Sequence, residues 1–88
     1  MQLTERKKLD ADVLANLDEW SHKATYVIRN GLIRNGRKTL STAQVLRACR
    51  RLEVKGLIKQ TDHTSYVVMK VWEITPAGRA SLAQGGDA

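Results

Sequence analysis

Three arginines and a glutamine lie close together in the stretch LSTAQVLRACRRLEVKGLIK, residues 40–59. The side chains of Arg47, Arg50, Arg51 and Gln44 are suited to binding, because guanidinium groups stay protonated and donate hydrogen bonds in a planar fork. A row of them offers cations to a polyanion. The alternative is a solvated surface helix, the usual role of a charged face. The basic stretches on either side favour the binding interpretation.

The same stretch predicts the helix that positions these cations. Ser41 is a good N-cap residue, and Gly56 stands where a helix can end in the left-handed region. Between them, apolar residues at i, i+3, i+4 and i+7 predict one buried face: Val45, Ala48, Cys49 and Leu52. The arginines fall opposite that face. On the buried face, Cys49 is predicted to be a packed thiol and not a redox sensor.

Charge is concentrated in the middle of the chain. The 88 residues carry a formal net charge of +6, which favours nucleic acid or an acidic surface as a partner. Between residues 23 and 59 the one anion is Glu53. The cations there are Lys23, Arg29, Arg34, Arg37, Lys38, Arg47, Arg50, Arg51, Lys55 and Lys59.

Catalytic and metal-binding motifs are missing from the sequence. One cysteine and two histidines, His22 and His63, cannot supply a four-ligand zinc site, and a single cysteine forms no disulfide framework. No phosphate-binding loop, dinucleotide fingerprint or nucleophile elbow occurs. We therefore predict a protein that is not an enzyme and that has neither a cofactor nor a metal.

Two further helices are expected before residue 40. The first is predicted over residues 5–19 with Thr4 as its cap, Asp10 on its outer face, and an apolar stripe of Leu9, Val13, Leu14, Leu17 and Trp20. It serves as a scaffold or, as an alternative, for dimerisation. Ser21 is predicted to cap the second helix, which ends either at Asn30-Gly31 or at Asn35-Gly36.

A hairpin and a short helix are predicted after Gly56. Its first strand covers residues 57–60, its tip residues 61–65 and its second strand residues 66–75, with 39–40 as a minimal third strand. Thr75 caps the last helix and Pro76 occupies its first position. Residues 84–88 are expected to form a disordered tail.

The second half of the chain resembles the winged helix-turn-helix family of bacterial and phage DNA-binding proteins. The resemblance covers about residues 39–83 and is carried by two groups, first Leu52, Glu53, Gly56, Leu57 and Ile58, then Trp72, Ile74, Thr75, Gly78 and Arg79. It implies an α+β fold with a three-helix core, a two- to three-stranded wing and a short C-terminal helix. Residues 1–83 would form one domain.

The resemblance also implies which residues would meet DNA. The helix at about 42–55 would enter the major groove, and the wing at about 57–75 would lie on the backbone or in the minor groove. Base-reading positions would be Thr42, Ala43, Gln44 and Arg47. Phosphate-binding positions would be Arg34, Arg37, Lys38, Arg50, Arg51, Lys59 and His63.

Apolar residues at the predicted wing indicate an interface as well. The second strand has two apolar faces, and a contiguous apolar surface left uncovered often marks a partner. The interface candidates are Leu46, Val67, Met69 and Val71, which suggests a homodimer or a protein partner. Leu46 has a second interpretation, in which it packs against the second helix.

The sequence thus predicts a small transcriptional regulator, bacterial or phage-borne, that binds double-stranded DNA sequence-specifically. A cytoplasmic, nucleoid-associated location is expected, since neither a signal peptide nor a membrane span is recognisable. One alternative is a winged-helix module that binds a protein without recognising DNA. Another is a DNA-binding accessory factor of recombination or excision.

Overall fold

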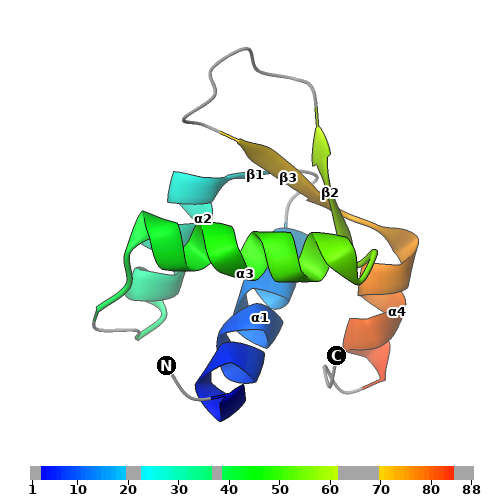
Figure 1. Cartoon of the computed structure of the whole chain (residues 1–88), viewed down its shortest axis with the longest axis horizontal. Coiled ribbons are helices and arrows are strands. Elements are labelled where there is room, and N and C mark those ends of the chain that lie inside the picture. The colour runs from blue at the N-terminus through cyan, green and yellow to red at the C-terminus, as the bar shows by residue number, and fades with distance from the viewer. Residues whose placement is uncertain (1–2, 20–22, 37–38, 62–69, 85–88) are drawn as a thin grey trace.

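The computed structural model describes residues 3–19, 23–36, 39–61 and 70–84 (Figure 1). The described residues form four helices and three short strands. The helices are α1 (Leu3–Asp18), α2 (Thr25–Arg34), α3 (Thr42–Val54) and α4 (Pro76–Ala83), and the strands are β1 (Lys23–Ala24), β2 (Ile58–Thr61) and β3 (Val71–Ile74).

The three strands form an antiparallel sheet in the order β1-β3-β2. In the register, Ala24 lies opposite Val71, and Ile58 lies opposite Ile74. Together with three packed helices and a short last helix, this sheet confirms the predicted α+β architecture. The predicted second strand was longer, and its residues 66–69 lie outside the described residues, as do most of the predicted tip and the tail from residue 85.

The third strand is not where the sequence analysis placed it. Lys23 and Ala24 form it by pairing with Trp72 and Val71. The predicted strand at residues 39–40 is wrong, because Leu40 turns its side chain into the core. The Leu40 carbonyl oxygen accepts a hydrogen bond of 2.7 Å from Arg29 Nε, which ties the connection before α3 to α2.

The start of α2 also differs from the prediction. The helix begins at Thr25 with Ala24 in the N-cap position, so the predicted cap, Ser21, is wrong. Pairing in β1 keeps residues 23–24 extended, which delays the helix. The helix then continues through Gly31 to Arg34, with Asn35 as its C-cap and Gly36 next to it at a φ of +113°, which confirms the later of the two predicted ends.

α1 packs along one side of the hydrophobic core. It begins at Leu3, so Thr4 lies in its first turn and is not its cap. The predicted stripe residues Leu9, Val13, Leu14 and Leu17 are completely buried, whereas Trp20 lies outside the described residues. Asp10 was predicted on the outer face, and this is wrong. Its side chain is buried because it faces α3.

Trp72 connects the sheet to α2. Its side chain is completely buried, and its Nε1 donates a hydrogen bond of 2.9 Å to Thr25 Oγ1. The Thr25 hydroxyl in turn donates to the Lys70 carbonyl oxygen over 3.0 Å, and the Thr25 amide donates to the same oxygen. Thr25 therefore supplies the hydrogen-bond acceptor for the Trp72 indole and joins α2 to β3.

The C-terminal end of α3 is fixed to α4. Gly56 adopts a φ of +76° after the last turn, as predicted. Thr75 caps α4, as predicted, and its hydroxyl also donates a 2.7 Å hydrogen bond to the Gly56 carbonyl oxygen. Gly78 packs so closely on the Leu57 carbonyl oxygen that a side chain there would clash with it.

We expect Thr25→Val to reduce the free energy of unfolding by about 1–3 kcal/mol, because the nearly isosteric valine leaves the buried Trp72 Nε1 without an acceptor. Urea denaturation followed by Trp fluorescence measures the change. The exposed Thr39→Val is the matched control. Equal effects of the two substitutions would show that the indole hydrogen bond contributes nothing.

Candidate nucleic-acid interface

The candidate interface is the outer side of α3. The predicted apolar residues of this helix, Val45, Ala48, Cys49 and Leu52, are all completely buried. The opposite face carries Ala43, Arg47, Arg50 and Val54, all of them exposed. The side chain of Val54 is 88% exposed, so nothing in the described chain covers this face.

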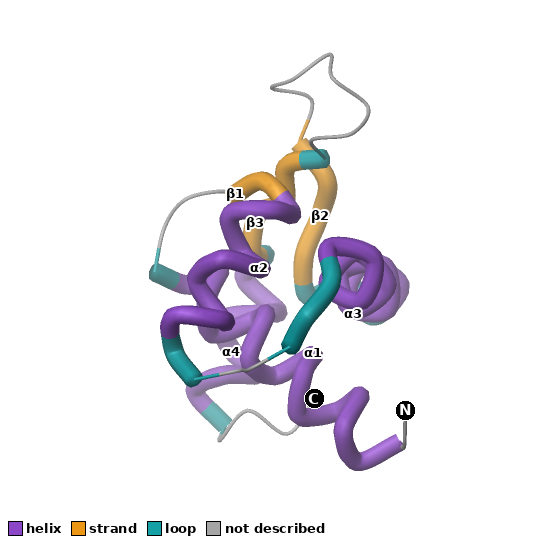
Figure 2. Tube along the Cα trace, turned by 90° about the vertical axis from the view of Figure 1, so that its left-hand side faces the viewer, coloured by secondary structure: helices purple, strands orange, loops and turns teal. Residues whose placement is uncertain are grey.

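The surroundings of α3 leave this face open. In Figure 1, α3 crosses in front of α1, with β2 and β3 on one side and the N-terminal end of α1 on the other. Figure 2 shows α3 almost end-on at the outer margin of the molecule, and the N-terminal end of α1 extends to the same margin.

The predicted base-reading residues differ in their exposure and in the hydrogen bonds that they already make. Thr42, Ala43 and Arg47 are exposed. Gln44 is half-buried. Its side-chain Oε1 accepts a hydrogen bond of 2.8 Å from the backbone amide of Ser41, and the Ser41 hydroxyl accepts one from the backbone amide of Gln44. This is a capping box, which the spacing Ser-x-x-Gln already signals in the sequence. Gln44 thus has a structural task that the sequence analysis missed.

Arg51 makes a different contact from the predicted phosphate contact. Its Nη2 lies 2.7 Å from Asp10 Oδ1, and its Nε lies 3.0 Å from Asp10 Oδ2. The Asp10 side chain is 6% exposed and that of Arg51 is 32% exposed. The hydrogen bond to Asp10 raises the pKa of Arg51. This fork fixes α3 on α1 and neutralises one cation of the row.

The other predicted phosphate contacts are spread around α3. Arg50 is exposed next to Arg47, and neither forms an ion pair or side-chain hydrogen bond within the described part of the chain. Lys59 is exposed on β2, with its Nζ 3.7 Å from Glu73 Oε2. Arg34 is exposed at the end of α2. The remaining three, Arg37, Lys38 and His63, lie outside the described residues.

The predicted interface residues are described only in part. Leu46 is half-buried and packs against the core, which agrees with its packing interpretation. Val71 is half-buried on β3, while Val67 and Met69 lie outside the described residues. An interface on that strand stays a prediction.

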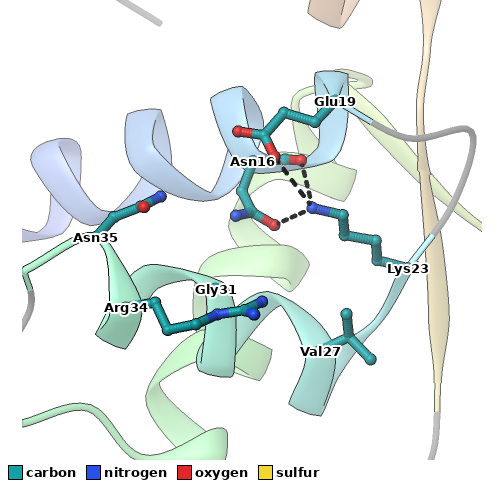
Figure 3. A pocket seen from close by; sticks show the side chains of 7 residues that line it. All are labelled: Asn16, Glu19, Lys23, Val27, Gly31, Arg34 and Asn35. Atoms are coloured by element: carbon teal, nitrogen blue, oxygen red, sulfur yellow. Dashed lines mark hydrogen bonds and ion pairs between the residues drawn. The ribbon is translucent and has the colours of Figure 1, made fainter.

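A pocket of about 410 Å³ lies between α1 and α2, away from the outer side of α3 (Figure 3). Lys23 Nζ points into it and donates to the Asn16 carbonyl oxygen (2.9 Å) and to Asn16 Oδ1 (2.8 Å), with Glu19 Oε2 at 3.7 Å. Burial lowers the pKa of Lys23, and the Glu19 carboxylate opposes this. The amine therefore finds its partners within the fold and anchors β1 on α1.

Reactive groups are scarce in the described structure. Burial, and after it the negative charges of Asp10 and Glu53, raise the pKa of Cys49 to about 12. No group of three or more metal-binding side chains occurs among the described residues. Among those same residues, no helix has the length and apolar character needed to cross a membrane.

Comparison with known proteins identifies the fold. No protein-family model and no curated protein sequence matches the chain. A crystal structure of a PadR family transcription regulator from hypervirulent Clostridium difficile R20291 is similar to it, with a TM-score of 0.69 and 22% sequence identity. The similarity covers 88% of this chain and 81% of that one. The chain therefore has the winged helix-turn-helix fold, as the resemblance in its sequence predicts.

We expect Arg51→Met to reduce the free energy of unfolding by about 1–2 kcal/mol, because it leaves the buried Asp10 carboxylate without its fork. Solvent reaches about a third of the Arg51 side chain, which keeps the loss in this range. Arg50→Met, one position earlier on the exposed face, is the control, and urea denaturation is the measurement. A loss no larger than that of Arg50→Met would contradict the anchoring role of Arg51.

We expect Cys49 to resist alkylation in the folded protein. With a pKa of about 12, only about one thiol in ten thousand is ionised at pH 8, and the side chain is completely buried. Mass spectrometry after iodoacetamide treatment should show modification in urea but not in buffer. Rapid and complete modification of the folded protein would revive the redox-sensor interpretation.

Proposed function

We propose that this protein binds double-stranded DNA as a small transcriptional regulator, with α3 in the major groove. The observation that carries this proposal is the open outer face of α3, on which Arg47 and Arg50 stand exposed, without partners among the described residues. The similar solved structure is that of a transcription regulator, which supports the proposal at the level of the fold. A cytoplasmic location at the nucleoid follows from it.

The structure supports a division of roles among the cations. Arg47 lies near the middle of the outer face, from which its fork can reach O6 and N7 of a guanine. Arg50 lies one turn farther along the helix and is assigned to a phosphate, as are Lys59 and Arg34. Arg51 is left out of this set because Asp10 holds its guanidinium.

Gln44 has fewer side-chain atoms available to DNA than a base-reading residue needs. Its Oε1 is used in the capping box, which leaves its Nε2 as the group available to a base. Bidentate recognition of adenine needs both amide atoms, so we assign Gln44 to positioning α3 rather than to reading adenine. Thr42 and Ala43, exposed at the start of the helix, remain candidates for contact with a thymine methyl group.

We expect random-sequence duplex DNA to bind at low salt, with an affinity that falls steeply as salt is added. Neutralising about five phosphates predicts a slope of roughly −4 to −5 in a plot of log affinity against log salt concentration. Fluorescence anisotropy with a labelled duplex measures it. No binding at low salt would reject the proposal in favour of a winged-helix module that binds a protein.

We expect Arg47→Ala to weaken binding to the preferred site by about 1–3 kcal/mol and to relax selectivity at one base pair. Arg50→Ala, a matched loss of an exposed arginine, should weaken preferred and scrambled DNA equally. The preferred site is first selected from a random library, and both variants are then titrated on both duplexes. If Arg47→Ala also weakens the two duplexes equally, Arg47 contacts only a phosphate.

A further inference from the structure

A hollow of about 420 Å³ lies between the N-terminal half of α1 and the outer side of α3. It is separate from the pocket between α1 and α2 in Figure 3. Arginine is the main residue type around it. Its lining consists of Arg6, Leu9, Gln44, Arg47 and Arg51.

The charges of this hollow are only partly balanced within the part of the chain that the structure describes. Asp10 neutralises Arg51, but Arg6 and Arg47 are exposed and form no ion pair within the described residues. No acidic side chain is among the described residues that line the hollow. Two unpaired guanidiniums around one concave surface attract an anion, and their planar forks suit phosphate oxygens in particular.

The position of the hollow relates it to the proposed DNA face. Arg47 belongs to both, since it lines the hollow and stands on the outer face of α3. The N-terminal end of α1 lies on the side of α3 that faces away from β2 and β3 (Figure 1). It also extends to the same outer margin as α3 (Figure 2).

We propose that this hollow is a seat for a backbone phosphate of DNA, in which Arg6 of α1 supplies the principal cation. The proposal rests on the proposed function, because it requires α3 to lie in the major groove. A helix in that groove has a sugar–phosphate backbone on each side. The strands β2 and β3 would then face one of these two backbones, and Arg6 would contact the other.

This arrangement gives Arg6 and Arg47 different tasks. Arg47 extends from the edge of the hollow toward the bases. Arg6 contacts the phosphate in the hollow and so fixes the rotational position of α3 in the major groove. From the sequence, α1 is predicted to serve as a scaffold or for dimerisation, and Arg6 is not among the predicted DNA contacts. Its clue is the position of Arg6, one helical turn before the buried Leu9, on the side of α1 that meets α3.

The test neutralises the phosphates one at a time. A series of duplexes carries the selected site, and each duplex has a single uncharged methylphosphonate at one backbone position. Full-length wild-type protein, Arg6→Gln, Arg6→Lys and Lys8→Gln are titrated against the series. Lys8 is the matched control because it is an exposed cation of the same helix that does not line the hollow.

We expect Arg6→Gln to weaken binding to unmodified DNA roughly three- to tenfold and to make the salt slope shallower by roughly 0.9, which is the effect of one lost phosphate contact. At one backbone position, methylphosphonate should weaken the wild type and Arg6→Lys but leave Arg6→Gln unchanged. Lys8→Gln should keep the wild-type pattern at every position.

Two results would overturn the proposal, and they differ from a failure of the proposed function. If Arg6→Gln remains sensitive at every position where the wild type is sensitive, Arg6 contacts no particular phosphate. If Arg6→Gln and Lys8→Gln weaken binding equally at all positions, only the total charge of α1 matters. A wild type that binds no duplex at low salt would instead reject the proposed function itself.

Discussion

The burial of one face of α3 against α1 is the constraint on which the rest of the structure depends. Val45, Ala48, Cys49 and Leu52 are completely buried, and this leaves the arginines of the helix to point outward or sideways. The Arg51–Asp10 fork then fixes the rotation of α3 about its own axis. An apolar stripe alone tolerates some rotation, whereas a fork with two oxygens specifies one orientation.

Local signals in the sequence predicted the parts of the fold that local forces decide. Ser41, Gly56 and Thr75 mark helix ends through caps or a left-handed backbone, and each was assigned correctly. Two local features were still misjudged, since Thr4 lies inside α1 and the capping box of Gln44 was missed. Other errors came from contacts between residues far apart in the chain. Lys23 and Ala24 become a strand only because β3 lies beside them, and Asp10 is buried only because Arg51 meets it.

The candidate site was predictable to a similar degree. The helix and its exposed basic face could be read from the spacing of the residues, because helical periodicity separates the two faces. The spacing of the residues does not reveal which cations are free of ion pairs, because charge pairing depends on the tertiary fold. Arg51 and Arg50 are adjacent in the sequence and both basic, yet one is held by Asp10 and the other is exposed without a partner in the described chain.

If the outer face of α3 binds DNA, a short duplex should change the environment of that face before any other. Two-dimensional NMR of ¹⁵N-labelled protein, titrated with the duplex at low salt, measures this residue by residue. We expect the largest amide shifts along α3 from Thr42 to Arg50, smaller shifts on β2 and little change along α4. Shifts centred on α4, or none at all, would show that DNA does not bind to α3.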